Sequence, residues 1–185
     1  MGFRINWYEA DKKTPVTITK HDDWTDVDIN GRCILHNNGT EFFMDLLNTE
    51  DFRKEVTCLY EDSDVLYYAI SKAGFKMIIL EYRKRVIEYM KEYLEEFMKY
   101  DFADEKKLWL GSRLIDEWKS EITEWESEYK DDRDNEIHYF NIKFCDNPSE
   151  FEISSSWKYK YAIYDMLTIY RSFDWDNYTM VVYGG

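Results

Sequence analysis

The stretch that decides the fold runs from residue 76 to residue 129 and contains two long amphipathic patterns. The first is KMIILEYRKRVIEYMKEYLEEFMKY (residues 76–100), and the second is DEKKLWLGSRLIDEWKSEITEWESEY (residues 104–129). Apolar side chains recur in both at steps of three and four, which places them on one face of an α-helix. Their members are Ile79, Tyr82, Val86, Met90, Tyr93 and Phe97 in the first, and Leu108, Gly111, Ile115, Trp118, Ile122, Trp125 and Tyr129 in the second. Because a short acidic turn separates the two patterns, we expect an antiparallel helical hairpin.

Alternation of apolar and polar residues predicts strands in residues 1–36. The apolar members of this alternation are Phe3, Ile5, Trp7, Val16, Ile18, Val27 and Ile29. Asn30-Gly31 is a strong hairpin signal, because both residues tolerate the positive φ of a type I′ turn. We therefore expect a hairpin that joins Thr25–Ile29 to Arg32–Leu35.

Residues 40–130 are predicted to be helical throughout. Thr40 and Thr49 are typical N-caps of short helices, and Ser63 is the expected N-cap of a third helix that ends at Gly74. The two long helices follow, the second with Asp104 as its N-cap.

Residues 136–185 are predicted to contain strands and one helix. Strands are expected over 136–145 and around residues 151–153, a helix over 157–173, and a last strand over 178–183. The sequence therefore predicts a single α+β domain over residues 1–185. In it, an antiparallel sheet of N- and C-terminal strands packs against a central helical region with a long antiparallel helical hairpin.

The composition is that of a folded, acidic protein. The chain has 185 residues, 44% of them hydrophobic and 18% aromatic, and carries a net charge of −14. The high aromatic content, tyrosine above all, fits an interaction surface, although an AT-rich genome would also raise tyrosine and phenylalanine. Three scattered cysteines and no long apolar run predict a cytoplasmic protein with no membrane partner.

Half of the net charge lies between Asp116 and Glu136. This segment holds ten carboxylates against three cations, which gives −7 of the total −14. At 100° per residue, four of the glutamates fall within about 60° of one another on the second long helix. This acidic stripe consists of Glu117, Glu121, Glu124 and Glu128.

Other residues flank or extend the acidic stripe. Trp118 and Trp125 lie beside it at the edge of the apolar seam, and Asp131, Asp132 and Asp134 are expected to continue it into the following turn. Carboxylates four residues apart repel by about 0.2–0.5 kcal/mol per pair, and they meet the helix dipole unfavourably near the C-terminus. The arrangement is therefore either a solvated, solubilising helix face or a binding surface that resembles a row of phosphates beside stacked bases.

A second acidic cluster lies near the N-terminus. It contains no cation and consists of Asp22, Asp23, Asp26 and Asp28. Asp26 and Asp28 are expected to share one strand face, with Val27 and Ile29 on the other.

Cations gather between Lys72 and Lys107, where nine stand against eight anions. Two interpretations remain open. In the first, the cations Arg83, Lys84 and Arg85 pair with the neighbouring acidic helix. In the second, they contact nucleic acid directly, but the lack of a nucleic-acid-binding motif disfavours this interpretation.

Catalytic and metal-binding motifs are largely missing from the sequence. His21, Asp22 and Asp23 are the best candidates for a cation site, but the spacing matches no calcium loop. We expect no cofactor, and no family resemblance reaches the level of a motif.

The sequence favours a binding protein over an enzyme. The expected function is inhibition of a basic, nucleic-acid-handling partner by occupation of its DNA or RNA groove, the strategy of DNA mimics among anti-CRISPR, phage or mobile-element inhibitors and of immunity proteins. The alternatives are a metal-dependent nuclease, which would use the His21/Asp22/Asp23 region or the Lys72–Lys107 cations, and an oligomerising protein with aromatic patches.

Overall fold

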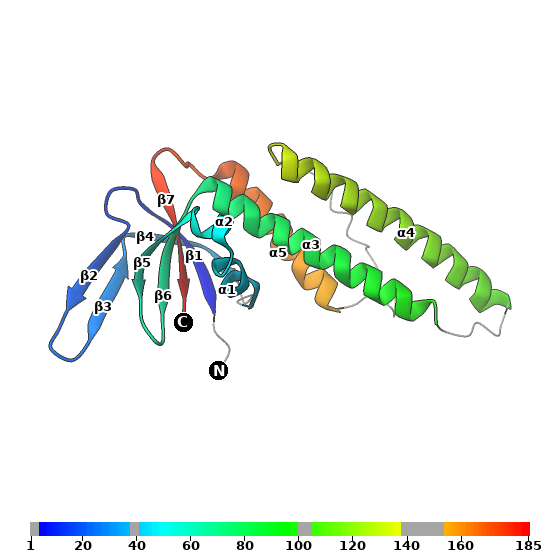
Figure 1. The fold of residues 1–185 in the computed structure, drawn as a ribbon, viewed down its shortest axis with the longest axis horizontal. Helices are drawn as coiled ribbons and strands as arrows, with labels where there is room; N and C mark the ends of the chain where they lie inside the picture. The colour runs from blue at the N-terminus through cyan, green and yellow to red at the C-terminus, as the bar shows by residue number, and fades with distance from the viewer. Residues whose placement is uncertain (1–3, 38–40, 100–104, 138–153) are drawn as a thin grey trace. The chain divides into compact units, whose positions relative to one another are not determined.

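The structure is a computed structural model that describes residues 4–37, 41–99, 105–137 and 154–185. The chain divides into two compact units. One comprises Met1–Ile78 and Asp165–Gly185, and the other comprises Ile79–Tyr164. The fold is α+β, with an antiparallel sheet formed by N- and C-terminal strands together with helices (Figure 1).

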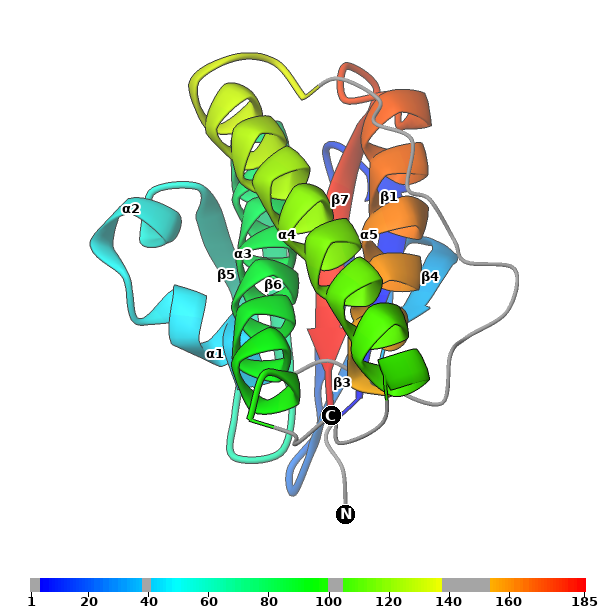
Figure 2. The same ribbon diagram turned by 90° about the vertical axis from the view of Figure 1, so that its right-hand side faces the viewer.

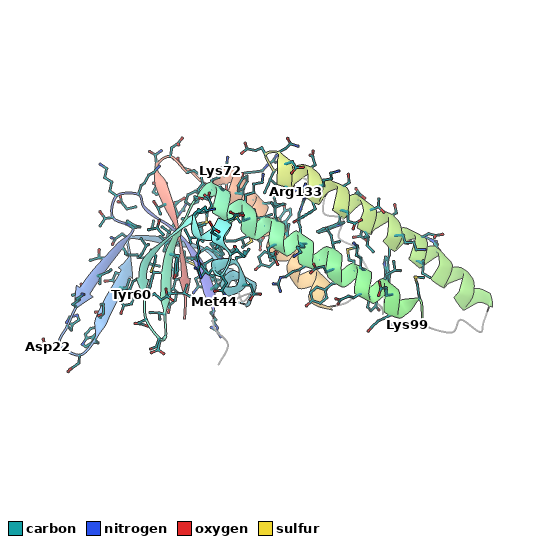
Figure 3. All side chains as sticks on the ribbon, viewed as in Figure 1. Asp22, Met44, Tyr60, Lys72, Lys99 and Arg133 are labelled. Atoms are coloured by element: carbon teal, nitrogen blue, oxygen red, sulfur yellow. The ribbon has the colours of Figure 1, made fainter. Side chains whose placement is uncertain are left out.

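The first unit is built on a five-stranded antiparallel sheet in the order β4-β1-β7-β6-β5. The strands are β1 (Ile5–Asp11), β4 (Gly31–Asn37), β5 (Val56–Glu61), β6 (Leu66–Ile70) and β7 (Tyr178–Gly184). The C-terminal strand β7 lies between β1 and β6, which confirms that strands from both ends of the chain share one sheet. A separate two-stranded hairpin contains β2 (Val16–Lys20) and β3 (Thr25–Ile29), with Asp22 at its tip (Figure 3).

The predicted hairpin at Asn30-Gly31 was wrong. β3 pairs with β2, whereas β4 pairs with β1, and no described residue has positive φ. Asn30 instead ties the chain to the start of β2, since its side-chain amide donates to the Thr14 carbonyl at 2.8 Å. Gly31 lets the backbone of β4 approach the backbone of β1 closely, because a Cβ at this position would lie 2.0 Å from the carbonyl oxygen of Glu9.

The predicted helix from Ser63 to Gly74 was also wrong, because this region contains the turn and second strand of the β5–β6 hairpin. β-Branched and aromatic residues favour strands on both sides of the turn. The Asp62 carboxylate accepts hydrogen bonds from the backbone N–H groups of Asp64 at 2.8 Å and Val65 at 3.0 Å, which closes the turn.

Aromatic side chains form the core of the first unit on one face of the sheet. Trp7 packs edge-on against Phe43 at 6.3 Å and Phe75 at 5.2 Å between ring centroids. Phe43 belongs to α1 (Glu41–Leu47) and also contacts Phe52 of α2 (Glu50–Arg53). Phe75 lies in the first turn of α3 (Lys72–Phe97). The predicted N-cap Thr49 precedes α2, but its hydroxyl donates to the Leu46 carbonyl instead of capping the helix.

The second unit contains the predicted helical hairpin. Its helices are α3 from Ile79 onward and α4 (Glu105–Asp134), which run side by side in Figures 1 and 2. Tyr93 contacts Trp118, whereas Arg83, earlier in α3, contacts Asp132, later in α4. The two helices are therefore antiparallel, as their seams predict.

The C-terminal predictions are confirmed where the structure describes the chain. The expected helix is α5 (Ser154–Ser172) and the last strand is β7. The expected strands over 136–145 and around 151–153 fall almost entirely outside the described residues, as do Thr40 and Asp104. Within the described ranges, no helix combines the length and apolar character that a membrane crossing requires.

Candidate functional site

The acidic stripe on α4 lies at the boundary between the helical seam and the exposed side. Glu117 and Glu124 are exposed, whereas Glu121 and Glu128 are half-buried. This order follows the helical angles, because Glu121 and Glu128 are turned by about 20–40° from Glu117 toward the apolar seam. The stripe therefore exists as a row, but its members differ in exposure.

The sequence analysis placed Asp131, Asp132 and Asp134 in the turn after the helix. In the structure they are helical, because α4 continues to Asp134. Asp131 remains exposed and accepts a hydrogen bond from the Asn135 amide at 3.0 Å. Asp134 is exposed and pairs with Arg133. Asp132 is only 3% exposed and faces α3, so it does not extend the surface.

A buried ion pair holds Asp132 in place. Arg83 of α3, whose side chain is 1% exposed, donates from Nη1 to Asp132 Oδ2 at 2.6 Å and from Nη2 to Glu128 Oε2 at 3.3 Å. Burial lowers the pKa of Arg83 to about 10, against the opposing effect of the two carboxylates. Burial also raises the pKa of Glu128, although Arg83 acts against that shift. These two carboxylates thus compensate a buried cation.

The three consecutive basic residues of α3, Arg83 to Arg85, all form ion pairs. Arg83 pairs with α4, as one interpretation of the sequence predicts, and its burial removes it from any nucleic-acid surface. Lys84 and Arg85 pair instead within α3, with Glu88 at 3.8 Å and Glu81 at 3.0 Å.

Two further carboxylates of α4 have cationic partners. Lys91 of α3 bridges to Glu126 at 2.5 Å, and Glu117 accepts from Arg113 one turn earlier at 2.8 Å. Both pairs are about half exposed and contribute little stability. They reduce the bare negative charge that the sequence alone indicates.

The two tryptophans serve the helical hairpin. Trp125 is 6% exposed, and Trp118 is half-buried against Tyr93, with 5.1 Å between ring centroids. Neither indole stands free beside the carboxylates. Any binding surface on α4 is therefore mainly polar and acidic.

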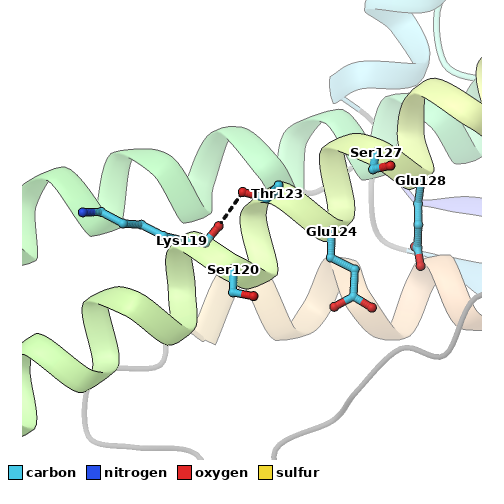
Figure 4. A pocket seen from close by; sticks show the side chains of 6 residues that line it. All are labelled: Lys119, Ser120, Thr123, Glu124, Ser127 and Glu128. Carbon is cyan, nitrogen blue, oxygen red and sulfur yellow. Dashed lines mark hydrogen bonds between the residues drawn. The ribbon is translucent and has the colours of Figure 1, made fainter.

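A hollow of about 570 Å³ lies along α4, and Figure 4 shows the six side chains that line it. The described side chains that line it are Lys119, Ser120, Thr123, Glu124, Ser127 and Glu128. Three of these side chains are small hydroxyl groups, and the Thr123 hydroxyl donates a hydrogen bond to the Lys119 carbonyl. Two glutamates of the acidic stripe thus border a surface depression.

The second acidic cluster lies on the β2–β3 hairpin of the other unit. Asp26 and Asp28 share one face of the hairpin. Their cross-strand partners on β2 are Thr19 and Thr17, respectively. His21 stacks on Trp24 at 3.9 Å and lies 3.5 Å from the Asp26 carboxylate. Asp22 and Asp23 are exposed at the hairpin tip, beside His21.

The region proposed for a nuclease metal does not assemble a ligand set. Among the residues that the structure describes, no group of three or more histidine, cysteine, aspartate or glutamate side chains is arranged to hold a metal ion. The nuclease alternative therefore gains no support from the described part of the chain.

One group of polar residues was missed by sequence reasoning. The structure brings Cys33 and His36 of β4 together with Asn6 of β1. An odd spacing of three normally places strand residues on opposite faces, so the pattern gave no signal. What brings the three residues together is an irregularity in the pairing of β1 with β4, and the periodicity of the sequence does not reveal it.

Comparisons with protein-family models, curated proteins and solved structures found no match to this chain.

Proposed function

We propose that this protein is a non-enzymatic binding protein that uses the exposed side of α4 to occupy the basic groove of a nucleic-acid-handling protein. The observation that carries the proposal is a row of exposed carboxylates spaced by seven residues. This exposed acidic row consists of Glu117, Glu124 and Asp131. Seven residues of α-helix correspond to about 10.5 Å, so the row presents a regular line of negative charge.

The chemistry of the row favours a basic partner. A net charge of −14 repels nucleic acid and anionic membranes, and it accelerates encounter with a positively charged groove. The half-buried Glu121 lies between two exposed members and adds to the same field, whereas Glu128 is engaged by Arg83. Inhibition follows because a partner whose groove is filled by α4 cannot hold DNA or RNA there.

The test is capture of partners by the intact protein from nuclease-treated and untreated lysates, read by mass spectrometry. The E117Q/E124Q/D131N variant removes the exposed acidic row without touching the Arg83 ion pair. The matched control is E92Q/E95Q/E96Q, which makes the same charge change at exposed positions of α3.

We expect the wild type and the α3 control to enrich the same basic nucleic-acid-binding protein, with or without nuclease, and the α4 variant to lose it. The affinity for that protein should fall as salt rises. Equal enrichment by the α4 variant, or no basic protein in any sample, contradicts the proposal.

A further inference from the structure

The β2–β3 hairpin extends the pairing of β1 with β4 beyond the five-stranded sheet (Figure 1). The β1–β4 ladder ends at Ala10 and Gly31, and the β2–β3 ladder begins at Val16 and Ile29. In the part of the chain that the structure describes, β2 pairs with no strand other than β3. A hairpin of two strands is only marginally stable in water, and an edge strand offers backbone groups to another chain. Pairing at the outer edge of β2 would therefore stabilise the hairpin.

The backbone hydrogen bonds of the hairpin decide which groups point to this edge. The Pro15 carbonyl accepts from the Asn30 N–H at 2.9 Å, and the His21 N–H donates to the Trp24 carbonyl at 2.8 Å. Hydrogen-bonded pairs alternate with non-hydrogen-bonded pairs in an antiparallel ladder, so the odd-numbered residues of β2 bond to β3. The even-numbered residues point their N–H and C=O groups to the outer edge. These outward-facing residues are Val16, Ile18 and Lys20.

The opposite edge of the hairpin, on β3, is less suited to pairing. Val27 pairs with Ile18, so its carbonyl points away from β2, and it accepts from the Tyr67 hydroxyl of β6 at 3.4 Å. A two-fold pairing of β3 through Val27 would also place Asp26 opposite Asp28 of a second copy. Like charges directly opposite one another destabilise a sheet. The edge of β2 is therefore the one that favours a further strand.

The side chains of β2 are those of a pairing strand. Its first four residues, VTIT, are all β-branched, and β2 contains no carboxylate although the chain is strongly acidic. Ile18 lies at the centre of the strand and is 41% exposed. A lysine on an edge strand discourages pairing, but Lys20 is the last residue of β2 and leaves the centre uncharged.

We propose that two copies of this chain associate by antiparallel pairing of their β2 strands about a two-fold axis at Ile18. The outward-facing residues are symmetric about this position, so Ile18 opposes Ile18 of the second copy and Val16 opposes Lys20. The N–H and C=O groups of all three residues then form hydrogen bonds across the axis. The result is a four-stranded sheet in the order β3-β2-β2-β3, in which the two Ile18 side chains cover each other.

The charges of the hairpin fit this antiparallel arrangement. The tip carries the exposed Asp22 and Asp23, whereas the exposed Lys13 precedes the base of the hairpin. Antiparallel pairing brings the tip of each copy to the base of the other, so Lys13 of one copy approaches the acidic tip of the second. Attraction between these groups favours the antiparallel orientation.

The acidic face of the hairpin does not oppose the pairing. Across the two-fold axis Thr17 lies opposite Thr19 of the second copy, and each threonine pairs with an aspartate of its own β3. Three strand spacings, about 14 Å, therefore separate Asp28 from Asp26 of the second copy. At this distance ions at physiological strength screen most of the repulsion.

The proposed interface is small. Five residues of strand span about 17 Å, which places the contact at the low end of interface sizes. We therefore expect a dimer that forms at micromolar concentration and dissociates on dilution. The interface lies in the first unit and uses no residue of α4, so it stands apart from the proposed binding function.

The test is sedimentation velocity of the full chain from micromolar to sub-millimolar concentration, in 150 mM NaCl to screen the net charge. The I18K variant places two like charges opposite each other at the two-fold axis. The matched control is M44K, which introduces the same charge at a methionine of α1 that is also 41% exposed. Circular dichroism establishes that each variant is folded.

We expect the wild type and M44K to shift from monomer to dimer as the concentration rises. The dissociation constant of the I18K dimer should be higher by about tenfold or more, because the like charges lie directly opposite. A wild type that stays monomeric throughout, or equal dissociation constants of I18K and M44K, overturns the proposal.

A mixture of two variants tests the register of the pairing. I18E also places like charges at the axis, so by itself it should stay monomeric where I18K does. In an equal mixture, the introduced ammonium lies opposite the introduced carboxylate only if residue 18 of one copy faces residue 18 of the other. We expect the mixture to form dimers at a concentration where each variant alone is monomeric. A mixture that stays monomeric overturns the pairing through Ile18, whereas recovery of the dimer requires that both variants are folded.

Discussion

At the scale of single residues, the clearest energetic feature is the buried guanidinium of Arg83. A buried charge is costly unless it is paired and hydrogen-bonded, and here Asp132 supplies the shorter of two charged contacts, at 2.6 Å. Asp132 was expected from sequence to face a partner, yet it stabilises the hairpin from within. The helical angle of a carboxylate does not reveal whether the opposing helix carries a buried cation.

Replacement of Asp132 by alanine should destabilise the protein by about 3–5 kcal/mol, because it leaves Arg83 buried without its main partner. The measurement is urea unfolding followed by circular dichroism. The matched control is Asp131→Ala, at the neighbouring exposed position, which should change the free energy of unfolding by less than about 0.5 kcal/mol. Equal effects of the two variants would show that the Arg83 ion pair contributes nothing to the fold.

Gly31 carries a steric constraint that composition alone does not show. A Cβ at this position would lie 2.0 Å from the Glu9 carbonyl oxygen and 2.6 Å from the Ala10 Cα, both backbone atoms that cannot turn away. We expect Gly31→Ala to cost about 3 kcal/mol by forcing β1 and β4 apart. Arg32→Ala, which removes the ion pair between the exposed Arg32 and the half-buried Glu9, should cost about 1 kcal/mol or less in the same thermal or urea unfolding experiment. A similar loss in both variants would contradict the steric explanation.

At the scale of elements, periodicity predicted the long helices and failed at the hairpins. The seams of α3 and α4 repeat over many turns, so local pattern suffices to find them. The Asn30-Gly31 signal failed because β4 finds a non-local partner in β1, which no short window contains. The β5–β6 hairpin was missed because the turn is closed by the Asp62 side chain rather than by glycine.

The Asp62 turn makes the β5–β6 hairpin sensitive to acid. Hydrogen bonds from the backbone N–H groups of Asp64 and Val65, and then from the Tyr60 hydroxyl, lower the pKa of Asp62 below its usual value of 3.8. Since the folded pKa is depressed, this contribution to stability is present above about pH 4 and is lost as the pH falls through the folded pKa. Acid therefore weakens the hairpin.

Asp62→Asn should reduce this acid dependence, because the amide oxygen still accepts both backbone bonds but does not ionise. The urea midpoint, measured at pH 7 and pH 3, should fall less in D62N than in the wild type. Asp64→Asn is the control and should keep the wild-type difference, because neither bond is accepted by the Asp64 carboxylate. If D62N and D64N lose the same amount between the two pH values, Asp62 is not the source of the acid dependence.

At the scale of the whole molecule, the α+β class and the shared sheet of terminal strands could be predicted, whereas the composition of both sites could not. The acidic stripe was found because charge is visible in sequence, but the burial of Asp132 depends on its contact with Arg83 of α3. The group of Asn6, Cys33 and His36 depends on one extra residue, Ile34, in a pairing between strands that are separated in the sequence. Charge and periodicity are local properties, whereas these sites are set by contacts between distant segments.

Net charge is a property of the whole chain with a direct consequence for stability. At −14, the folded protein suffers self-repulsion that mobile ions screen, with a Debye length of about 30 Å at 0.01 M salt and 8 Å at 0.15 M. We therefore expect the thermal midpoint to rise when NaCl increases from 10 mM to 150 mM. A midpoint that falls or stays constant would contradict a fold limited by self-repulsion.

The variants that test binding also locate this repulsion. The E117Q/E124Q/D131N variant and the E92Q/E95Q/E96Q variant each remove three exposed negative charges, but only the first removes them from the segment that holds half of the net charge. If repulsion is concentrated on α4, the first variant should be more stable than the wild type at 10 mM NaCl and less dependent on salt than the second. Equal salt dependence in the two variants would show that the charge acts as a uniform field. In that case the α4 carboxylates would not destabilise the fold more than other exposed carboxylates do, and their clustering would give no support to a binding function.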